Sequence, residues 1–266
     1  MKTLHFDYWM EISYTEPVTE CHYTFKCLPK DTDMQQISEL KVEIMPHHDY
    51  QRGEDSWGNV MIYDDLYQKH DRFGFHIQGT AKTGLTVGEK ENSGELVGPY
   101  IYPYGLNKAG DRIKAYYKKV IETMGESCAS AYETAMYFMN CLYRDFTYEK
   151  WITDVNTTAE EAWHLKRGVC QDYAHIFIAM CHLAKIPARY VTGMMTGEGY
   201  SHAWAEILSE GIWYGVDPTN GCTVGDSYIK IGMGRDANDC KINKGIMTGG
   251  GLQTQSICVR VEEKPE

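Results

Sequence analysis

The first 87 residues of this chain are strand-like almost throughout, and this constrains the fold more than any other feature. β-Branched and aromatic residues fill segments such as LHFDYWMEISY, CHYTFKCLP, ELKVEIMP and FGFHIQGTAKTGLTV. Turn-forming segments, including LPKDTD and EDSWGN, separate them. Strands joined by such short connections pair with antiparallel neighbours. We therefore expect an antiparallel β domain over residues 1–100, ended by a linker in the Gly- and Pro-rich segment 91–105.

The rest of the chain, residues 101–266, has a mixed composition that begins helical and ends strand-like. Helices are expected over 107–124, 127–143, 158–166 and 170–185, and strands over 188–195, 201–209, 212–216, 227–232 and 256–262. The third helix has a capping box, Thr158 with Glu161, and we expect it to close at Gly168. The Gly-rich segment 248–251 is interpreted as a flap near the functional site. The second domain is therefore predicted to be α+β.

Charge and cysteine content exclude several classes of protein. The 37 Asp and Glu residues outnumber the 26 Lys and Arg residues and leave a net charge of −11, which would repel a phosphate backbone, so we expect no nucleic-acid partner. The longest nearly apolar stretch, residues 176–184, is too short to span a membrane, and residues 1–14 do not resemble a signal peptide. Nine scattered cysteines contain no CxxC pair. We expect a cytoplasmic protein with no disulfide framework and no membrane association; its oligomeric state has no signature in the sequence.

Cys170 stands out among the nine cysteines because it opens the predicted helix 170–185. A thiolate on the first turn of a helix is stabilised by the positive end of the helix dipole. Gly168 permits a tight approach of the chain into this helix. The backbone N–H of Cys170 points to where the oxyanion of an attacked carbonyl would lie. This position is typical of a cysteine nucleophile, although a buried structural cysteine is the more common case on an apolar helix.

A base and an orienting acid follow in the next predicted hairpin. His202 lies in the strand SHAWAEILS, and Asp217 ends the strand GIWYGVD. If the turn is centred between Ser209 and Glu210, the two residues face each other directly, with Cβ atoms about 4.5–5.5 Å apart. A register shift of two residues would leave them diagonal on one face, whereas a shift of one would place them on opposite faces.

Three blocks of this sequence resemble the bacterial branch of the transglutaminase-like superfamily. They are RGVCQDYA with the following IPARYV, then SHAWAE, then VDPTN, in the order and spacing of that branch. The early strands, with EPV at 16–18 and WGN at 57–59, resemble the β-rich N-terminal region that often precedes this domain.

The resemblance implies a papain-like α+β core, in which the helix that bears Cys170 packs on an antiparallel sheet. It implies a catalytic triad with Cys170 as nucleophile, His202 as base and then acid, and Asp217 as orienter, working through a thioester and without a cofactor. The substrate would be a peptide or protein. Water as acyl acceptor would make the protein a cysteine protease or amidase, which we expect. An amine acceptor would make it a transglutaminase, and a non-catalytic interaction module of the same fold is a further alternative.

Other polar residues near the triad have weaker assignments. Tyr148, Trp151 and Gln171 are candidates for a second oxyanion donor or for substrate binding, because they lie close to Cys170 in the sequence; packing is the other interpretation. Asp172 favours the start of the helix electrostatically. A zinc site would draw its ligands from Cys170, His175, Cys181, His182, His202 and Cys222. Positions 170 and 175 lie about 140° apart around a helix, so we expect no metal.

Overall fold

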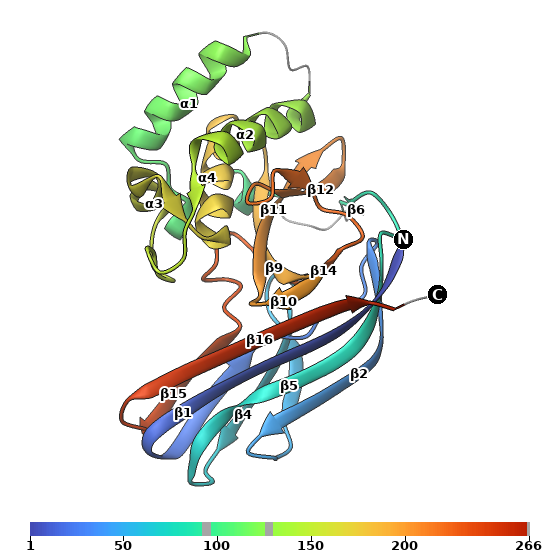
Figure 1. The fold of residues 1–266 in the computed structure, drawn as a ribbon, viewed down its shortest axis with the longest axis vertical. Helices are drawn as coiled ribbons and strands as arrows, with labels where there is room; N and C mark the ends of the chain where they lie inside the picture. Colours follow the sequence, from blue (N-terminus) through green and yellow to red (C-terminus); the bar gives the residue numbers. More distant parts are fainter. Residues whose placement is uncertain (92–96, 126–129, 265–266) are drawn as a thin grey trace.

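Two antiparallel sheets and a group of helices make up the fold, which is α+β as predicted (Figure 1). The computed structural model describes residues 1–91, 97–125 and 130–264. The helices lie at one end of the molecule, the larger sheet lies at the other end, and the smaller sheet lies between them. No helix among the described residues is long and apolar enough to cross a membrane.

The larger sheet is built around one very long strand, β1. Within the described residues it has eight strands: β1 (Lys2–Phe25), β2 (Gln35–Met45), β3 (Gln51–Glu54), β4 (Val60–Leu66), β5 (His70–Thr83), β10 (Gly197–Gly199), β15 (Asn243–Gly249) and β16 (Gln253–Glu263). We expected two strands where β1 is continuous. Its pairing with β5 is interrupted only between Ser13 and Val18, and alternate side chains such as Phe6, Tyr8 and Met10 are fully buried. This alternation is the pattern of a strand with one face against a core.

The smaller sheet and the helices form the second part of the fold. Within the described residues the smaller sheet has six strands: β6 (Glu89–Lys90), β9 (Ala188–Met195), β11 (His202–Ser209), β12 (Ile212–Asp217), β13 (Cys222–Thr223) and β14 (Tyr228–Gly234). A parallel pair, β7 (Thr147–Tyr148) and β8 (Arg167–Gly168), lies apart from it. The helices are α1 (Asp111–Met124), α2 (Ala131–Asp145), α3 (Ala159–Leu165), α4 (Cys170–Leu183) and the short 3₁₀ helices η1 (Gly98–Tyr100) and η2 (Gly105–Asn107).

Helix α4 lies at the centre of the second core. Its side chains from Asp172 to His182 are all buried, because α1, α2, α3, β9 and β11 all pack against it. The helix begins at Cys170 as predicted and ends two residues earlier than expected, at Leu183. A helix that is buried all round is fixed in position by its packing. The first turn of α4 is therefore a rigid platform.

Helix boundaries agree with the sequence where capping groups were recognised. Thr158 and Glu161 form the predicted capping box of α3. The helix ends at Lys166, which adopts a left-handed backbone with φ 58°, and not at Gly168, which lies in β8. A long polar side chain replaces the expected glycine at this cap.

The structure bears on the predicted domain boundary and on the predicted flap, and two predicted segments lie partly outside the described residues. The boundary near residue 100 assigns β15 and β16 to the second domain, yet both pair with β1 in the larger sheet. The flap interpretation is wrong: Gly249–Gly251 pack against β1 residues such as Val18. Part of the predicted linker, residues 92–96, lies outside the described residues. The predicted start of the second helix, residue 127, also lies outside them, within 126–129.

The larger sheet also supports the segment that leads to His202. Strand β10, just before His202, pairs with β16 of that sheet.

Candidate active site

Cys170 is the first residue of α4, and its surroundings fix the geometry of that turn. Val169 has an extended backbone and acts as the N-cap. The Asp172 carboxylate accepts the Val169 N–H at 2.8 Å and the Thr153 hydroxyl at 2.7 Å. The role inferred for Asp172, at the start of the helix, is what the structure shows. Cys170 is half-buried, and the first N–H groups of a helix, including its own, have no intrahelical acceptor.

His202 joins Cys170 to Asp217. Its Nε2 lies 2.7 Å from Oδ2 of Asp217, and its ring lies close enough to the Cys170 side chain for Cys170 to raise the pKa of His202. Since an imidazole has two ring nitrogens and Nε2 faces the carboxylate, Nδ1 is the nitrogen left for the thiol. The Asp217 side chain is fully buried, and only 11% of the His202 side chain is exposed. The structure therefore brings together the three residues that the sequence singled out, with His202 between Cys170 and Asp217.

The hairpin that carries His202 and Asp217 has a different register from the predicted one. Ser209 pairs with Ile212, so the turn residues are Glu210 and Gly211, with φ values of 53° and 74°. Two positive φ values define the type I′ turn preferred in two-residue hairpins, and glycine favours its second position. The pairing is shifted by two residues, which leaves His202 and Asp217 diagonal on the same face. Their hydrogen bond survives because diagonal partners stay within reach of long side chains.

Asp217 accepts more hydrogen bonds than the sequence indicated. Besides His202, its Oδ2 accepts the Asn220 side-chain amide at 2.7 Å and the Tyr228 hydroxyl at 2.9 Å. Its Oδ1 accepts the backbone N–H groups of Thr219 at 2.9 Å and Asn220 at 3.2 Å. Sequence reasoning missed both side chains: Asn220 is detectable as the end of the VDPTN block, but Tyr228 comes from β14, which is not a neighbour of β12.

Electrostatics at the site favour a charged imidazole. Burial alone would lower the pKa of His202, but hydrogen bonds to Asp217 and Cys170 outweigh it and raise the pKa to about 10. Burial would raise the pKa of Asp217, yet its bonds to His202, Asn220 and Tyr228 hold it below the usual range. At neutral pH the pair is therefore imidazolium and carboxylate, and the imidazolium faces the Cys170 sulfur.

The three candidates for oxyanion or substrate contacts lie in different environments. Tyr148 pairs with Gly168 and lies close to Cys170: burial raises the pKa of Tyr148, and the nearby Cys170 raises it further. The Gln171 amide donates to the Val155 carbonyl at 3.4 Å. Trp151 is 87% exposed. The structure thus brings Tyr148 beside the thiol and leaves Trp151 in solvent.

The potential zinc ligands are dispersed. Nε2 of His175 accepts the Ala237 N–H at 3.1 Å, and Nε2 of His182 lies 3.3 Å from the Ala188 carbonyl. Cys222 is 3.5 Å from the Tyr228 hydroxyl. Across the described residues, no three His, Cys, Asp or Glu side chains are grouped closely enough to hold a metal ion.

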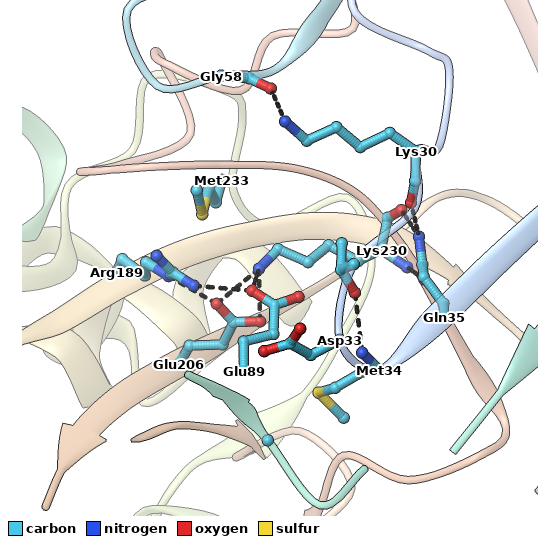
Figure 2. Close-up of polar contacts among 12 residues, drawn as sticks. Lys30, Asp33, Met34, Gln35, Gly58, Glu89, Arg189, Glu206, Lys230 and Met233 are labelled. Atoms are coloured by element: carbon cyan, nitrogen blue, oxygen red, sulfur yellow. Dashed lines mark hydrogen bonds and ion pairs between the residues drawn. The ribbon is translucent and has the colours of Figure 1, made fainter. Parts of the chain in front are cut away.

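A cavity with a volume of about 800 Å³ lies away from these residues. It lies between the loops of the larger sheet and strands β9 and β14, and no triad residue lines it. Figure 2 shows its charged wall, where Arg189 and Lys230 point toward Glu89 and Glu206, and the Lys30 ammonium donates to the Gly58 carbonyl.

These four side chains, Glu89, Arg189, Glu206 and Lys230, form a buried ion network. Arg189 donates to Glu206 at 2.6 Å and to Glu89 at 3.0 Å, and Lys230 donates to both carboxylates at 2.8 Å. Two cations and two carboxylates neutralise one another. The network has no net charge and is separate from the group formed by Cys170, His202 and Asp217.

Comparison with known proteins identifies the families that two parts of this chain match. Residues 118–218 match the family model of the transglutaminase-like superfamily, and residues 4–82 match that of the bacterial transglutaminase-like N-terminal region. The resemblance inferred from the three sequence blocks is therefore confirmed.

Individual relatives cover the chain to different extents. An uncharacterized protein of Mycobacterium leprae is 26% identical over 268 residues, which cover 93% of this chain and 94% of that protein. An uncharacterized protein of Mycobacterium tuberculosis is 34% identical over 122 residues, or 40% of this chain and 39% of that protein. A provisionally named cysteine protease from Cytophaga hutchinsonii, at 19% identity, has a crystal structure with a TM-score of 0.78 that covers 100% of this chain and 91% of its own. This last likeness shows a shared fold.

Proposed function

We propose that this chain, which belongs to the transglutaminase-like superfamily through residues 118–218 and carries a bacterial transglutaminase-like N-terminal region over residues 4–82, is a cysteine-dependent amide hydrolase. One observation carries the proposal: His202 is hydrogen-bonded to the buried Asp217 carboxylate and lies close enough to the Cys170 side chain for Cys170 to raise its pKa. Acyl transfer by a cysteine needs a nucleophile, a base beside it and an acid that orients the base. The substrate class is a peptide or protein amide.

In acylation, Cys170 attacks the amide and His202 then protonates the leaving amine. The attacking form pairs a Cys170 thiolate with the His202 imidazolium, and the Cys170 sulfur forms a bond to the carbonyl carbon of the amide. The carbonyl oxygen becomes an oxyanion that the first-turn N–H of Cys170 stabilises. His202 then gives its proton to the amide nitrogen, the C–N bond breaks, and the amine leaves a thioester on Cys170.

Deacylation returns the enzyme to its starting state. His202 takes a proton from water, the water oxygen bonds to the thioester carbon, and the C–S bond breaks to release a carboxylic acid and restore the Cys170 thiolate beside protonated His202. A primary amine that replaced water would give an amide instead, which is the transglutaminase reaction. We propose water as the acceptor.

Tyr228 and Asn220 act as positioning residues for this reaction. Both donate to the same oxygen of Asp217 that meets His202. Donors on a carboxylate stabilise its charged form and fix its orientation, so they hold the imidazole between Asp217 and Cys170.

The test is intact-protein and product mass spectrometry with a library of peptide amides, in the presence and absence of a primary amine. The expected result is an acyl adduct on Cys170 that turns over to the free acid, with no adduct in the Cys170→Ala variant. An amide product that accumulates with added amine would identify a transglutaminase. The absence of any adduct or cleavage would contradict an enzymatic function and favour the interaction module.

A further inference from the structure

Three exposed aromatic side chains flank the candidate active site. Tyr148 is 47% exposed and Tyr200 is 54% exposed. Tyr148 pairs with Gly168, two residues before Cys170; burial raises the pKa of Tyr148, and Cys170 and Tyr200 raise it further. Tyr200 precedes His202 by two residues. The two tyrosines therefore lie near the nucleophile and the base.

Trp151 extends this aromatic surface from a turn that is anchored at both ends. Before it, the Glu149 N–H donates to the Gly168 carbonyl at 2.8 Å. After it, the Thr153 hydroxyl donates to Asp172 on the first turn of α4. The position of this turn beside the start of α4 is thus fixed by hydrogen bonds.

A cation links the same turn to the segment before His202. The Lys150 ammonium lies 5.2 Å from the centre of the Tyr200 ring, within the range of a cation–π contact. The turn that carries Trp151 is therefore held between the helix of the nucleophile and the strand of the base.

Trp151 is unusual in two respects. It is 87% exposed, whereas the other five tryptophans, all within the described residues, are buried or half-buried. Its backbone is left-handed, with φ 68°, a conformation that bulky residues rarely adopt because it costs free energy. Exposed apolar surface and backbone strain are both unfavourable in the free protein. Both are typical of a residue whose stabilising contacts form on binding.

We propose that Trp151, Tyr148 and Tyr200 form an aromatic rim that binds an aromatic or large apolar side chain of the peptide substrate, next to the amide that Cys170 attacks. This inference rests on the proposed function, because it assigns the substrate class of the same site. Aromatic rings bury much surface per residue at little conformational cost, and they favour stacked or edge-on contacts with another ring.

The experiment measures equilibrium binding to the full chain with Cys170→Ala, so that no peptide is consumed. Two blocked peptide amides are compared by calorimetry, identical except for Phe or Ala beside the central amide. The Phe peptide should bind at least about tenfold more tightly than the Ala peptide, as expected for an anchor residue. Adding Trp151→Asn should reduce this ratio to near one; asparagine is chosen because it tolerates the left-handed backbone.

The matched control is Tyr67→Asn in the same Cys170→Ala background. Tyr67 is 66% exposed and lies between β4 and β5, away from the site, so the ratio should be unchanged. Equal affinity for the two peptides, or a preference that survives Trp151→Asn, would overturn the rim. Cleavage of both peptides by the wild-type chain in that case would leave the hydrolase intact. Preferential binding of the Phe peptide without cleavage by the wild-type chain would overturn the hydrolase and retain the rim.

Discussion

Two charged clusters on the smaller sheet show two different uses of buried charge. Strand β11 contributes to both. His202 belongs to the triad with Cys170 and Asp217, and Glu206 belongs to the ion network. Glu206 lies four residues after His202 on the same face of the strand. In the network, Arg189 and Lys230 each contact both Glu89 and Glu206. In the triad, Asp217 is saturated by donors, while one nitrogen of His202 faces a half-buried thiol that can react. We therefore expect the network to act on the stability of the fold. In the triad, we expect the proton on His202 to be transferred during the reaction.

The largest expected effect is the loss of hydrolysis rate in Asp217→Asn, a substitution in the triad. Asp217→Asn keeps the shape of the side chain but removes the charge that orients and stabilises the His202 imidazolium. The hydrolysis rate should fall by about 10⁴-fold, the loss typical of neutralising the acid of such a triad. Steady-state kinetics on any peptide cleaved by the wild-type chain would measure it. A variant with full activity would show that Asp217 does not orient His202.

The matched substitution in the network, Glu206→Gln, should affect stability instead. It leaves two buried cations with one carboxylate fewer, and breaking such a network costs about 3 kcal/mol. Urea unfolding followed by fluorescence would measure the free energy of unfolding. The rate per folded molecule should stay within about twofold of wild type, since changes to a separate network are close to additive. A large loss of catalytic rate with unchanged stability would reverse the assignment of the two clusters.

The pH dependence should also distinguish the clusters. The pKa of His202 is raised from 6.5 to about 10, so its protonated form contributes stability fully below pH 6.5, and this contribution is lost as the pH rises through 10. Hydrolysis should fall about tenfold per pH unit above 10, because the imidazole then has no proton for the leaving amine.

The network should respond at the opposite end of the pH scale. Burial would raise the pKa of Glu89, but Lys230 and Arg189 lower it from 4.5 to about 2. Its contribution to stability is present above pH 4.5 and is lost as the pH falls through 2. Unfolding free energies measured between pH 2 and 11, for wild type and Glu206→Gln, would show whether the acid loss belongs to the network. An acid loss of equal size in both proteins would assign it to other carboxylates.

The smallest effect is expected for Tyr228→Phe, which removes one of the donors to Asp217. One hydrogen bond to a charged group is lost while the ring is kept, so the hydrolysis rate should fall about tenfold or less. The acid limb of the pH–rate profile should move to higher pH, because Asp217 becomes easier to protonate. Tyr173→Phe is the control, since its hydroxyl donates to the Phe146 carbonyl and touches no triad residue. Equal pH profiles in the two variants would assign Tyr228 to packing.

The sequence predicted those parts of the site that depend on local chemistry. The position of Cys170 at the start of α4 follows from the helical spacing of its apolar residues and from Pro187 beyond its end. The presence of His202 and Asp217 on one hairpin also follows from local pattern. The register does not, because the Ser209–Glu210 pair is polar and suits a turn, whereas the observed turn uses the left-handed freedom of Gly211 one position later.

Contacts between distant segments escaped the sequence. Tyr228 reaches Asp217 across strands that are not neighbours, and nothing in its own segment marks it. Lys230 and Glu206 each alternate with apolar residues, which reads as an ordinary strand with one solvated face, yet they meet in the buried network. The return of β16 to pair with β1 is equally non-local. Patterns in a single sequence predict one helix or strand at a time, so they do not predict contacts between distant segments.

The most direct test of the central claim, that His202 activates Cys170, is to map which cysteine reacts with a trace of iodoacetamide at pH 6. Only thiolates react, so an ordinary thiol is nearly inert under these conditions. The structure predicts that Cys170 is alkylated much faster than the other cysteines in the wild-type chain, and that this selectivity is lost in His202→Ala but kept in Glu206→Gln. Labelling spread over other cysteines while Cys170 stays unmodified in the wild-type chain would contradict the claim.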